Sequence, residues 1–317
     1  MNSHLKSKYA NFNIVLMYYV IVSILTIYAT YKNGIMLFNK HLVPFISIFK
    51  PIGIVLIATF IPLLVNYIYT KYIKKEKYIL KEDYFPVYMS LISLCLPINL
   101  NIWLFMLLTL IFSIVRLFYK FDINYYAIIK LLIILLLILI GKYSYMSVYD
   151  LNVETNLTTL DMFLGRGIGG IATSNILLLI ICYLILCFNF TYKKEIPIIS
   201  FVSYLATVII YSIIFNNNII VNVKQLISSE FIYAIIVIAT MSFYSPVDLK
   251  SRVIYSILIG ILSFIFNMIF NIYEGVFVAI IVSNIIILII NKIGSVKNEH
   301  KRIWLWITRR KNSSKPT

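Results

Sequence analysis

A polar interruption divides this sequence into two apolar halves: residues 141–175 read GKYSYMSVYDLNVETNLTTLDMFLGRGIGGIATSN. It is the longest interval without a convincing membrane span. It gathers acidic residues, hydroxyl residues and four closely spaced glycines, Gly165, Gly167, Gly169 and Gly170. If the protein has a chemical function, we expect its site in this stretch.

The composition is that of a membrane protein. Of the 317 residues, 61% are hydrophobic and only 13% are charged, whereas ordinary globular chains carry roughly 25% charged residues. Repeated apolar runs of about 20 residues are long enough to cross the hydrocarbon core as helices. The net charge of +16 is explained by the Lys and Arg of cytoplasmic loops. We therefore predict an all-α polytopic membrane protein, whose partner is the lipid bilayer and not nucleic acid.

The distribution of Lys and Arg predicts how the helices are oriented. With the N-terminus inside, the cytoplasmic segments hold 21 Lys and Arg and the opposite side holds 5. Because cytoplasmic loops are enriched in these residues, both termini are predicted to be cytoplasmic and the polar interruption to lie on the outer side of the membrane. Ten spans are predicted, near residues 13–31, 43–69, 84–99, 101–119, 124–140, 175–192, 196–215, 229–245, 253–270 and 274–291.

Two segments in different halves resemble each other. FPVYMSLISLCLP (85–97) and FIYAIIVIATMSFYSP (231–246) are both apolar helices that end at a proline. They belong to spans three and eight, which cross in opposite directions, as an inverted-topology repeat requires. We predict about ten transmembrane helices as two inverted five-helix repeats. The chain then divides into a first half (1–140), an outer connecting loop (141–174), a second half (175–292) and a basic cytoplasmic tail (293–317).

Few side chains within the spans suggest chemistry. Cys95, Cys182 and Cys187 lie in apolar runs without metal-ligand spacing, so we predict no disulfide, zinc site or cysteine-ligated cluster. Lys50 and Lys130 fall inside predicted spans, where an ionisable residue is a functional candidate by default. Both lysines also lie near a predicted interface to which they could extend, and the sequence leaves these two interpretations open.

The glycine cluster precedes a predicted helix, and this arrangement favours a phosphate ligand. Glycines let backbone amides approach a ligand closely, and a helix N-terminus offers unpaired N–H groups and a partial positive charge. Thr173, Ser174 and Asn175 are candidate caps of that helix. Glycine clusters also form turns and close helix contacts, so the spacing alone supports either role.

Four stretches resemble the membrane-subunit family that includes RnfD of the Rnf electron-transport complex and NqrB of the sodium-pumping NADH:quinone reductase. The stretches at 238–266 and 273–284 are similar to the family's ATDP…SP…GR and PEG…FA…N patterns, in matching order and spacing. That family also has ten spans arranged as an inverted repeat. The four stretches are FPVYMSLISLCLPINLNIW (85–103), LGRGIGGIATSN (164–175), IATMSFYSPVDLKSRVIYSILIGILSFIF (238–266) and YEGVFVAIIVSN (273–284).

The resemblance implies electron transfer coupled to ion pumping, through FMN attached by a phosphoester to the threonine of an SGAT-P-L motif. DLNVETNL (150–157) occupies that place here, and Thr155 with Leu157 matches the T-x-L. Val153 and Glu154 stand where small residues are expected, and they add bulk and negative charge beside an incoming phosphate. A second, non-covalent flavin is also compatible with the resemblance. The cofactor-binding residues that it implies are Thr155, Gly165, Gly169, Gly170, Thr173 and Ser174.

Two functional hypotheses follow. In the first, the chain is a membrane subunit of an Rnf-type complex that transfers electrons through FMN, coupled to Na⁺ or H⁺ transport. Its partners would be the other membrane and peripheral subunits of a ferredoxin:NAD or NADH:quinone type oxidoreductase. In the second, it is a flavin-free relative that acts as a transporter, channel or scaffold subunit. The altered context of Thr155, and Met241 where the family has Asp, motivate the second; Thr158 and Thr159 are alternative attachment positions.

Overall fold

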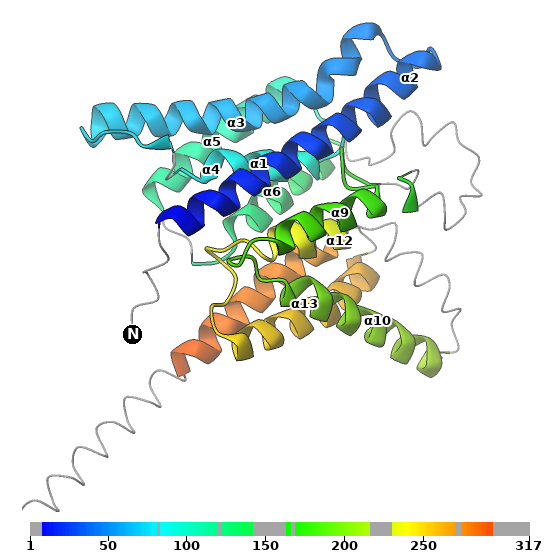
Figure 1. Cartoon of the computed structure of the whole chain (residues 1–317). Helices are drawn as coiled ribbons and strands as arrows, with labels where there is room; N and C mark the ends of the chain where they lie inside the picture. Colours follow the sequence, from blue (N-terminus) through cyan, green and yellow to red (C-terminus); the bar gives the residue numbers. More distant parts are fainter. Residues whose placement is uncertain are drawn as a thin grey trace, which may run out of the picture.

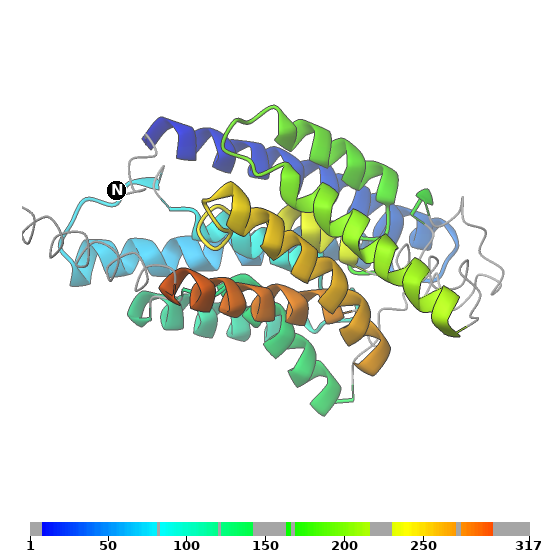
Figure 2. The ribbon, with the colours of Figure 1, turned by 90° about the horizontal axis from the view of Figure 1, so that it is seen from below.

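In a computed structural model, the chain folds as a bundle of helices that run in broadly the same direction (Figures 1 and 2). The N-terminal end of the first described helix and the C-terminal end of the last one lie at the same end of the bundle, which we call the terminal end (Figure 1). We call the opposite end the loop end. The structure describes residues 8–80, 83–119, 122–141, 163–165, 169–215, 230–270 and 274–293.

Ten helical segments follow one another in the predicted order, and the described residues include no β-strand. In the first half they are α1 (Lys8–Thr30) with η1 (Tyr31–Ile35) and α2 (Met36–Asn39), η2 (Phe45–Phe49) with α3 (Lys50–Ile68) and η3 (Tyr69–Ile73), α4 (Phe85–Leu94), α5 (Ile102–Phe118) and α6 (Tyr125–Leu139). In the second half they are α9 (Ile176–Cys187), α10 (Glu195–Phe215), α12 (Phe231–Tyr233) with η5 (Ala234–Ile238), α13 (Leu249–Phe270) and a C-terminal helix (Gly275–Ile293).

The predicted all-α polytopic membrane fold is confirmed. Within the described residues, five helical stretches are long and apolar enough to cross a membrane, and four shorter helices are also apolar. Large apolar side chains on the outside of the bundle remain exposed, among them Phe60, Leu139 and Ile213. A water-soluble protein would bury such side chains, whereas hydrocarbon accommodates them. The outer surface of the bundle is therefore suited to lipid.

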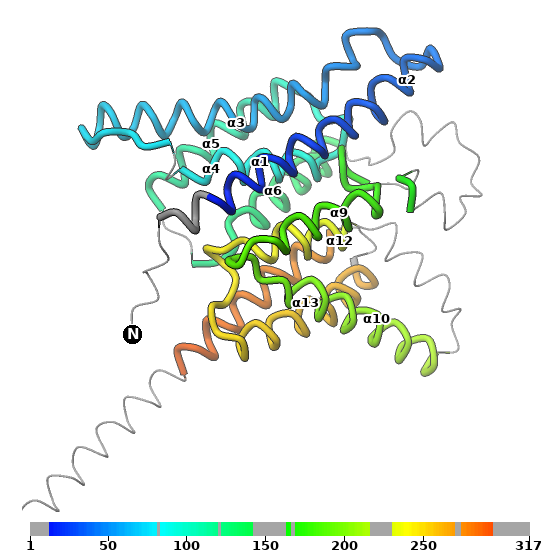
Figure 3. Tube along the Cα trace, in the orientation of Figure 1, coloured from blue at the N-terminus to red at the C-terminus, as the bar shows by residue number. Residues whose placement is uncertain are grey.

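Two of the predicted spans are much shorter in the structure than the sequence suggests. The spans predicted at 84–99 and 229–245 are helical only in α4, with ten residues, and in α12–η5, Phe231–Ile238. At 1.5 Å per residue these helices reach about 15 Å and 12 Å, about half of a hydrocarbon core of about 30 Å. We call α4 and α12–η5 the half-helices. Every residue in both is buried, so they form the centre of the bundle (Figure 3).

Each half-helix ends inside the bundle, where it meets the other half of the chain. The carbonyls of Leu94 and Leu96, at the end of α4, accept hydrogen bonds of 2.9 Å from the amides of Ala172 and Ile171. At the end of the second half-helix, η5, the Asn124 side chain donates a 2.9 Å hydrogen bond to the carbonyl of Ile238. Backbone groups at membrane depth must be satisfied by protein, and here residues far away in the sequence satisfy them.

The half-helices also contact each other directly. The hydroxyl of Tyr233 donates a 2.6 Å hydrogen bond to the carbonyl of Leu91. They are the third and eighth of the ten segments, the positions that the sequence comparison identified as a repeat. The division of the chain into two inverted halves joined by residues 141–174 stays a prediction, because most of this loop lies outside the described residues, as does the basic tail after Ile293.

Candidate functional site

At the loop end, a buried lysine lies beside the segment that precedes α9. Lys32 belongs to the π-helical turn η1 and is only 7% exposed. Its Nζ atom donates a 2.8 Å hydrogen bond to Oγ of Ser174. The neighbouring Asn33 is also buried and donates a 2.8 Å hydrogen bond from Nδ2 to the carbonyl of Ile171. Single π-helical turns often occur at functional sites, and this one directs two polar side chains toward the glycine-rich segment.

Tyr28 extends this polar group by one turn of α1. Its hydroxyl donates a 3.1 Å hydrogen bond to the carbonyl of Gly165 and lies 3.4 Å from Oγ of Ser174. We call Tyr28, Lys32, Asn33, Thr173 and Ser174 the loop-end polar group. A first span predicted at 13–31 places Lys32 in a loop on the outer side, whereas the structure buries it in η1. Three consecutive non-apolar residues after span one (Lys32, Asn33 and Gly34) were the available signal that this span continues as a polar, buried turn.

Two of the predicted site glycines occupy positions that exclude a side chain. Gly165 has a φ of +94°, a conformation that side chains disfavour. A Cβ atom on Gly170 would lie 2.7 Å from the carbonyl carbon of Cys95 and 2.7 Å from Oε1 of Glu230. Gly170 therefore lets the chain pass directly against the end of α4. Gly169 is half-buried next to it.

The amides of this segment already have acceptors within the protein. Gly170 N–H donates a 2.7 Å hydrogen bond to Oγ1 of Thr173, and the next two amides donate to the end of α4. Asn175 is the N-cap of α9 and accepts a 3.0 Å hydrogen bond from the amide of Leu178, which confirms the predicted capping at this residue. The glycines thus provide close packing here, and their contact with a phosphate stays a prediction. Thr155 lies outside the described residues.

A second polar site lies between the half-helices, around Lys130 on α6. The Lys130 side chain is fully buried. Its Nζ atom lies 2.7 Å from Oε2 of Glu230, donates a hydrogen bond to the carbonyl of Cys95, and lies 5.2 Å from the centre of the Phe277 ring. Lys130 therefore does not extend to an interface, and of the two interpretations the structure favours a buried charge. Lys50, in contrast, is only half-buried and begins α3.

The half-helix ends favour this ion pair. Cys95 is the C-cap of α4, and the partial negative charge at this end of the helix favours the Lys130 ammonium. Glu230 is the N-cap residue of α12; its side chain makes no cap hydrogen bond, and only the partial positive charge of the helix N-terminus favours its carboxylate. Glu230 is 1% exposed, and Glu274, which precedes the C-terminal helix and interacts electrostatically with Lys130, is fully buried. We call Lys130, Glu230 and Glu274 the central charge cluster.

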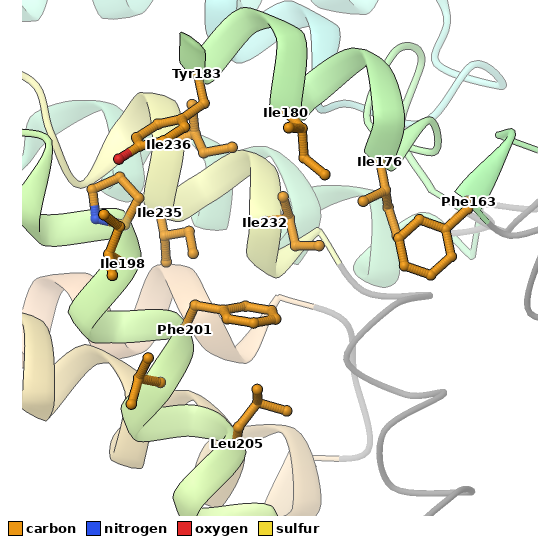
Figure 4. Close-up of a pocket in the computed structure, with 12 residues that line it drawn as sticks. Phe163, Ile176, Ile180, Tyr183, Ile198, Phe201, Leu205, Ile232, Ile235 and Ile236 are labelled. Carbon is orange, nitrogen blue, oxygen red and sulfur yellow. The ribbon is translucent and has the colours of Figure 1, made fainter. Parts of the chain in front are cut away.

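An apolar groove between α9, α10 and the half-helix α12–η5 is a different kind of feature. It has a volume of about 480 Å³, and the side chains labelled in Figure 4, such as Ile180, Phe201 and Ile235, are almost all apolar. The exception is Tyr183, whose hydroxyl donates a 3.1 Å hydrogen bond to the carbonyl of Lys194. Lacking charged groups, this groove can hold hydrocarbon but offers no group for chemistry.

Comparison with known proteins identifies the family. The sequence pattern of the NQR2, RnfD, RnfE family matches residues 128–298, more than half of the chain. The chain belongs to the NQR2, RnfD, RnfE family. This confirms the resemblance inferred from the sequence. No curated protein sequence matches the chain.

The residues matched by the family include the whole central charge cluster and the segment before α9. Lys130, Glu230 and Glu274 all lie between residues 128 and 298. Lys32 and the half-helix α4 lie outside the match, although they contact residues within it. As a member of the NQR2, RnfD, RnfE family, the chain is a multi-pass membrane protein and a subunit of a multi-subunit membrane complex of the Rnf or Nqr type.

Proposed function

We propose that this protein is the membrane subunit of an Rnf-type complex that passes electrons through FMN and couples their transfer to Na⁺ or H⁺ movement across a bacterial inner membrane, with both termini cytoplasmic. The observation that carries the proposal is the family match over residues 128–298. The described fold supports it, because helices interrupted near the middle of the bundle are a common feature of proteins that move ions.

The loop-end polar group is chemically suited to the phosphate of FMN. A phosphate prefers charge-assisted hydrogen bonds from cations and from hydroxyl or amide donors. Lys32 supplies the cation, Tyr28 and Ser174 supply hydroxyls, and all three meet at Oγ of Ser174. These residues would hold the phosphate of a flavin attached to Thr155, whereas Gly165 and Gly170 fix the course of the chain around it.

FMN would supply one- and two-electron transfer. The protein would hold the cofactor at the loop end and place it at the end of the bundle where α9 begins. The positive charge of Lys32 would lower the free-energy cost of burying a phosphate at the loop end. Electrons would pass to and from other subunits of the complex, since the family assembles with partners.

The test is covalent attachment of flavin. The full chain is co-expressed with a flavin transferase, purified, denatured and examined in a gel for flavin fluorescence. We expect a fluorescent band that Thr155→Val abolishes and that the matched variants Thr158→Val and Thr159→Val retain. A band retained by Thr155→Val but lost in one of the others would move the attachment site, and no band in the wild-type protein would overturn covalent attachment.

One structural feature favours the alternative, a flavin-free transporter, channel or scaffold subunit. Two half-helices that end inside a bundle are typical of proteins with a substrate site near the middle of the membrane. The central charge cluster lies at this position in the present chain. Purified protein that carries no flavin in either covalent or dissociable form, yet conducts ions in vesicles, would support this alternative.

A further inference from the structure

We propose that a basic turn at the end of η3 is a binding site for the headgroups of anionic phospholipids. The basic turn comprises residues 69–80, YTKYIKKEKYIL. It lies at the terminal end of the bundle, whereas the loop-end polar group lies at the opposite end (Figure 1). The inference does not rest on flavin or on the proposed function.

The basic turn carries a strong excess of positive charge. Four lysines and one glutamate lie within seven residues, which gives the turn a net charge of +3. All five side chains are exposed. Like charges so close together repel each other, and anionic groups placed among them remove this repulsion. The turn therefore favours an anionic partner. Its charged residues are Lys71, Lys74, Lys75, Glu76 and Lys77.

The turn is held in a defined shape. Lys75 has a φ of +56°, a left-handed conformation of the kind that ends helices. The next amide, that of Glu76, donates a 3.0 Å hydrogen bond back to the carbonyl of Thr70. Beyond the bend, the hydroxyl of Tyr78 donates a 2.8 Å hydrogen bond to Oδ2 of Asp83. The lysines are thus presented by a preorganised turn, and a ligand pays less conformational entropy to bind it.

Tyrosine rings order two of the lysine side chains. Nζ of Lys71 donates a 2.8 Å hydrogen bond to the hydroxyl of Tyr67 and lies 5.5 Å from the centre of the Tyr72 ring. Nζ of Lys74 lies 5.6 Å from the centre of the Tyr69 ring. An ammonium group has three N–H donors, so the bond to Tyr67 leaves donors of Lys71 for a phosphate. Tyrosine is enriched at membrane–water interfaces, which is the level of lipid headgroups.

The length of the helical stretch before the turn agrees with this level. Phe45–Ile73 has 29 residues and reaches about 44 Å at 1.5 Å per residue. A bilayer is about 40–45 Å thick with its headgroups, and its hydrocarbon core is about 30 Å thick. At the terminal end, η3 extends beyond the neighbouring described helices (Figures 1 and 2). When the apolar part of this stretch fills the hydrocarbon core, the lysines lie beside the lipid phosphates.

Apolar side chains next to the lysines favour a lipid over an acidic protein. The side chains of Tyr72, Ile73 and Leu80 are each more than half exposed. Segments that combine lysines with such side chains lie in the interface, where the apolar groups contact acyl chains and the ammonium groups extend to the phosphates. A phospholipid thus matches both parts of the turn, whereas an acidic protein surface would match only its charge.

The experiment measures the binding of a fluorescent phosphatidylglycerol to the full chain in neutral detergent by fluorescence anisotropy. Replacement of all four lysines of the turn by Gln should weaken binding about tenfold, because each lysine adds to the attraction for an anionic lipid. Replacement of the same four by Arg should preserve binding. The matched control replaces four exposed lysines elsewhere in the described chain by Gln and should bind nearly as tightly as the wild type; these are Lys40, Lys194, Lys250 and Lys292.

Competition identifies the occupant. Unlabelled phosphatidylglycerol should displace the probe, and phosphatidylcholine, whose headgroup has no net charge, should not. Equal displacement by phosphatidylcholine would overturn the proposal, because binding would then depend on acyl chains alone. Equal displacement by glycerol phosphate would show a site for soluble phosphates instead of lipid. Equal displacement by a polyglutamate peptide would assign the turn to an acidic protein partner.

The variants can also overturn the proposal. Equal weakening in the glutamine variant of the turn and in the matched control would show that only the net charge of the protein matters. All the substituted side chains are exposed, and both variants should therefore retain the helical circular dichroism of the wild type. If the fourfold variant does not fold, the double variant Lys74→Gln/Lys77→Gln, with one substitution on each side of the bend, decides the outcome by the same measurement. None of these results involves flavin, so a failure here is distinct from a failure of the proposed function.

Discussion

Nζ of Lys130 lies 2.7 Å from Oε2 of Glu230, although the two residues are 100 positions apart in the sequence. The first belongs to α6 in the first half of the chain and the second to the turn before α12 in the second half. Lys130 also donates a hydrogen bond to the carbonyl of Cys95 at the end of α4, so it links the ends of two half-helices that belong to different halves of the chain. The polar interior of this membrane protein is therefore built from both halves together.

Loss of the lysine should destabilise the protein in a pH-dependent way. Lys130→Met leaves Glu230 buried without its cation, and breaking such a pair typically costs about 3–5 kcal/mol. The cost should be larger at about pH 8 than at about pH 6, since a proton can replace the lost cation more easily at low pH. Denaturant unfolding in detergent at both pH values measures it. Lys250→Met, at an exposed position, is the control, and an equal effect at both pH values would contradict the expectation.

Gly170 should not tolerate a methyl group. Gly170→Ala places a Cβ atom 2.7 Å from the carbonyl carbon of Cys95, which is backbone and cannot rotate away. We expect a loss of about 1–3 kcal/mol in the free energy of unfolding, typical of overpacking. Gly53→Ala is the matched control, because nothing lies within 4 Å of its Cβ position. Equal thermal stability of the two variants would show that the segment before α9 can move away from α4.

Asn124 should matter more than an ordinary helix cap. It accepts a 3.2 Å hydrogen bond from the amide of Ala127 and also donates to the carbonyl of Ile238 at the end of η5. Asn124→Ala should cost about 2–3 kcal/mol, since it removes a cap and leaves a buried carbonyl unsatisfied. Asn101→Ala removes a cap of α5 at an exposed residue and should cost about 1 kcal/mol. Comparison of the two unfolding midpoints tests this difference.

Lys32 should be required for flavin loading if the proposed function is right. Lys32→Met removes the cation that donates to Ser174, so the proportion of protein with covalent flavin should fall about tenfold, equivalent to one charge-assisted hydrogen bond of about 1.4 kcal/mol. Lys40→Met, at an exposed residue near the same end, should load normally. In-gel fluorescence per mole of protein measures both, and equal loading would remove Lys32 from the site.

The sequence predicted the fold class well because membrane spans can be recognised from hydropathy and from the distribution of charged residues. Ten helical segments follow the predicted order, and the two segments compared as a repeat, 85–97 and 231–246, contain the half-helices. The length of these half-helices was not predicted, because a buried apolar segment has the same hydropathy whether it is helical or extended. Only Pro97, after the end of α4, gave a local signal.

The candidate site was predicted less completely. The segment with Gly170, Thr173 and Ser174 was identified, and the structure brings Ser174 to Lys32. The partners of that segment could not be found from spacing, because Lys32, Cys95 and Glu230 approach it from elements far away in the sequence. Lys130 was recognised as a candidate by its depth alone, but its partner Glu230 lay at a predicted span boundary and gave no signal.

The half-helices also have a consequence for how the protein is made. The end of α4 receives its hydrogen bonds from residues 171 and 172, which the ribosome adds about 75 residues later. Until those residues enter the membrane, the nascent first half carries unsatisfied carbonyls in hydrocarbon, and Lys130 lacks Glu230. An early product that stops before α9 would therefore be a substrate for membrane proteases. Biogenesis of this protein is complete only when the second half has been inserted.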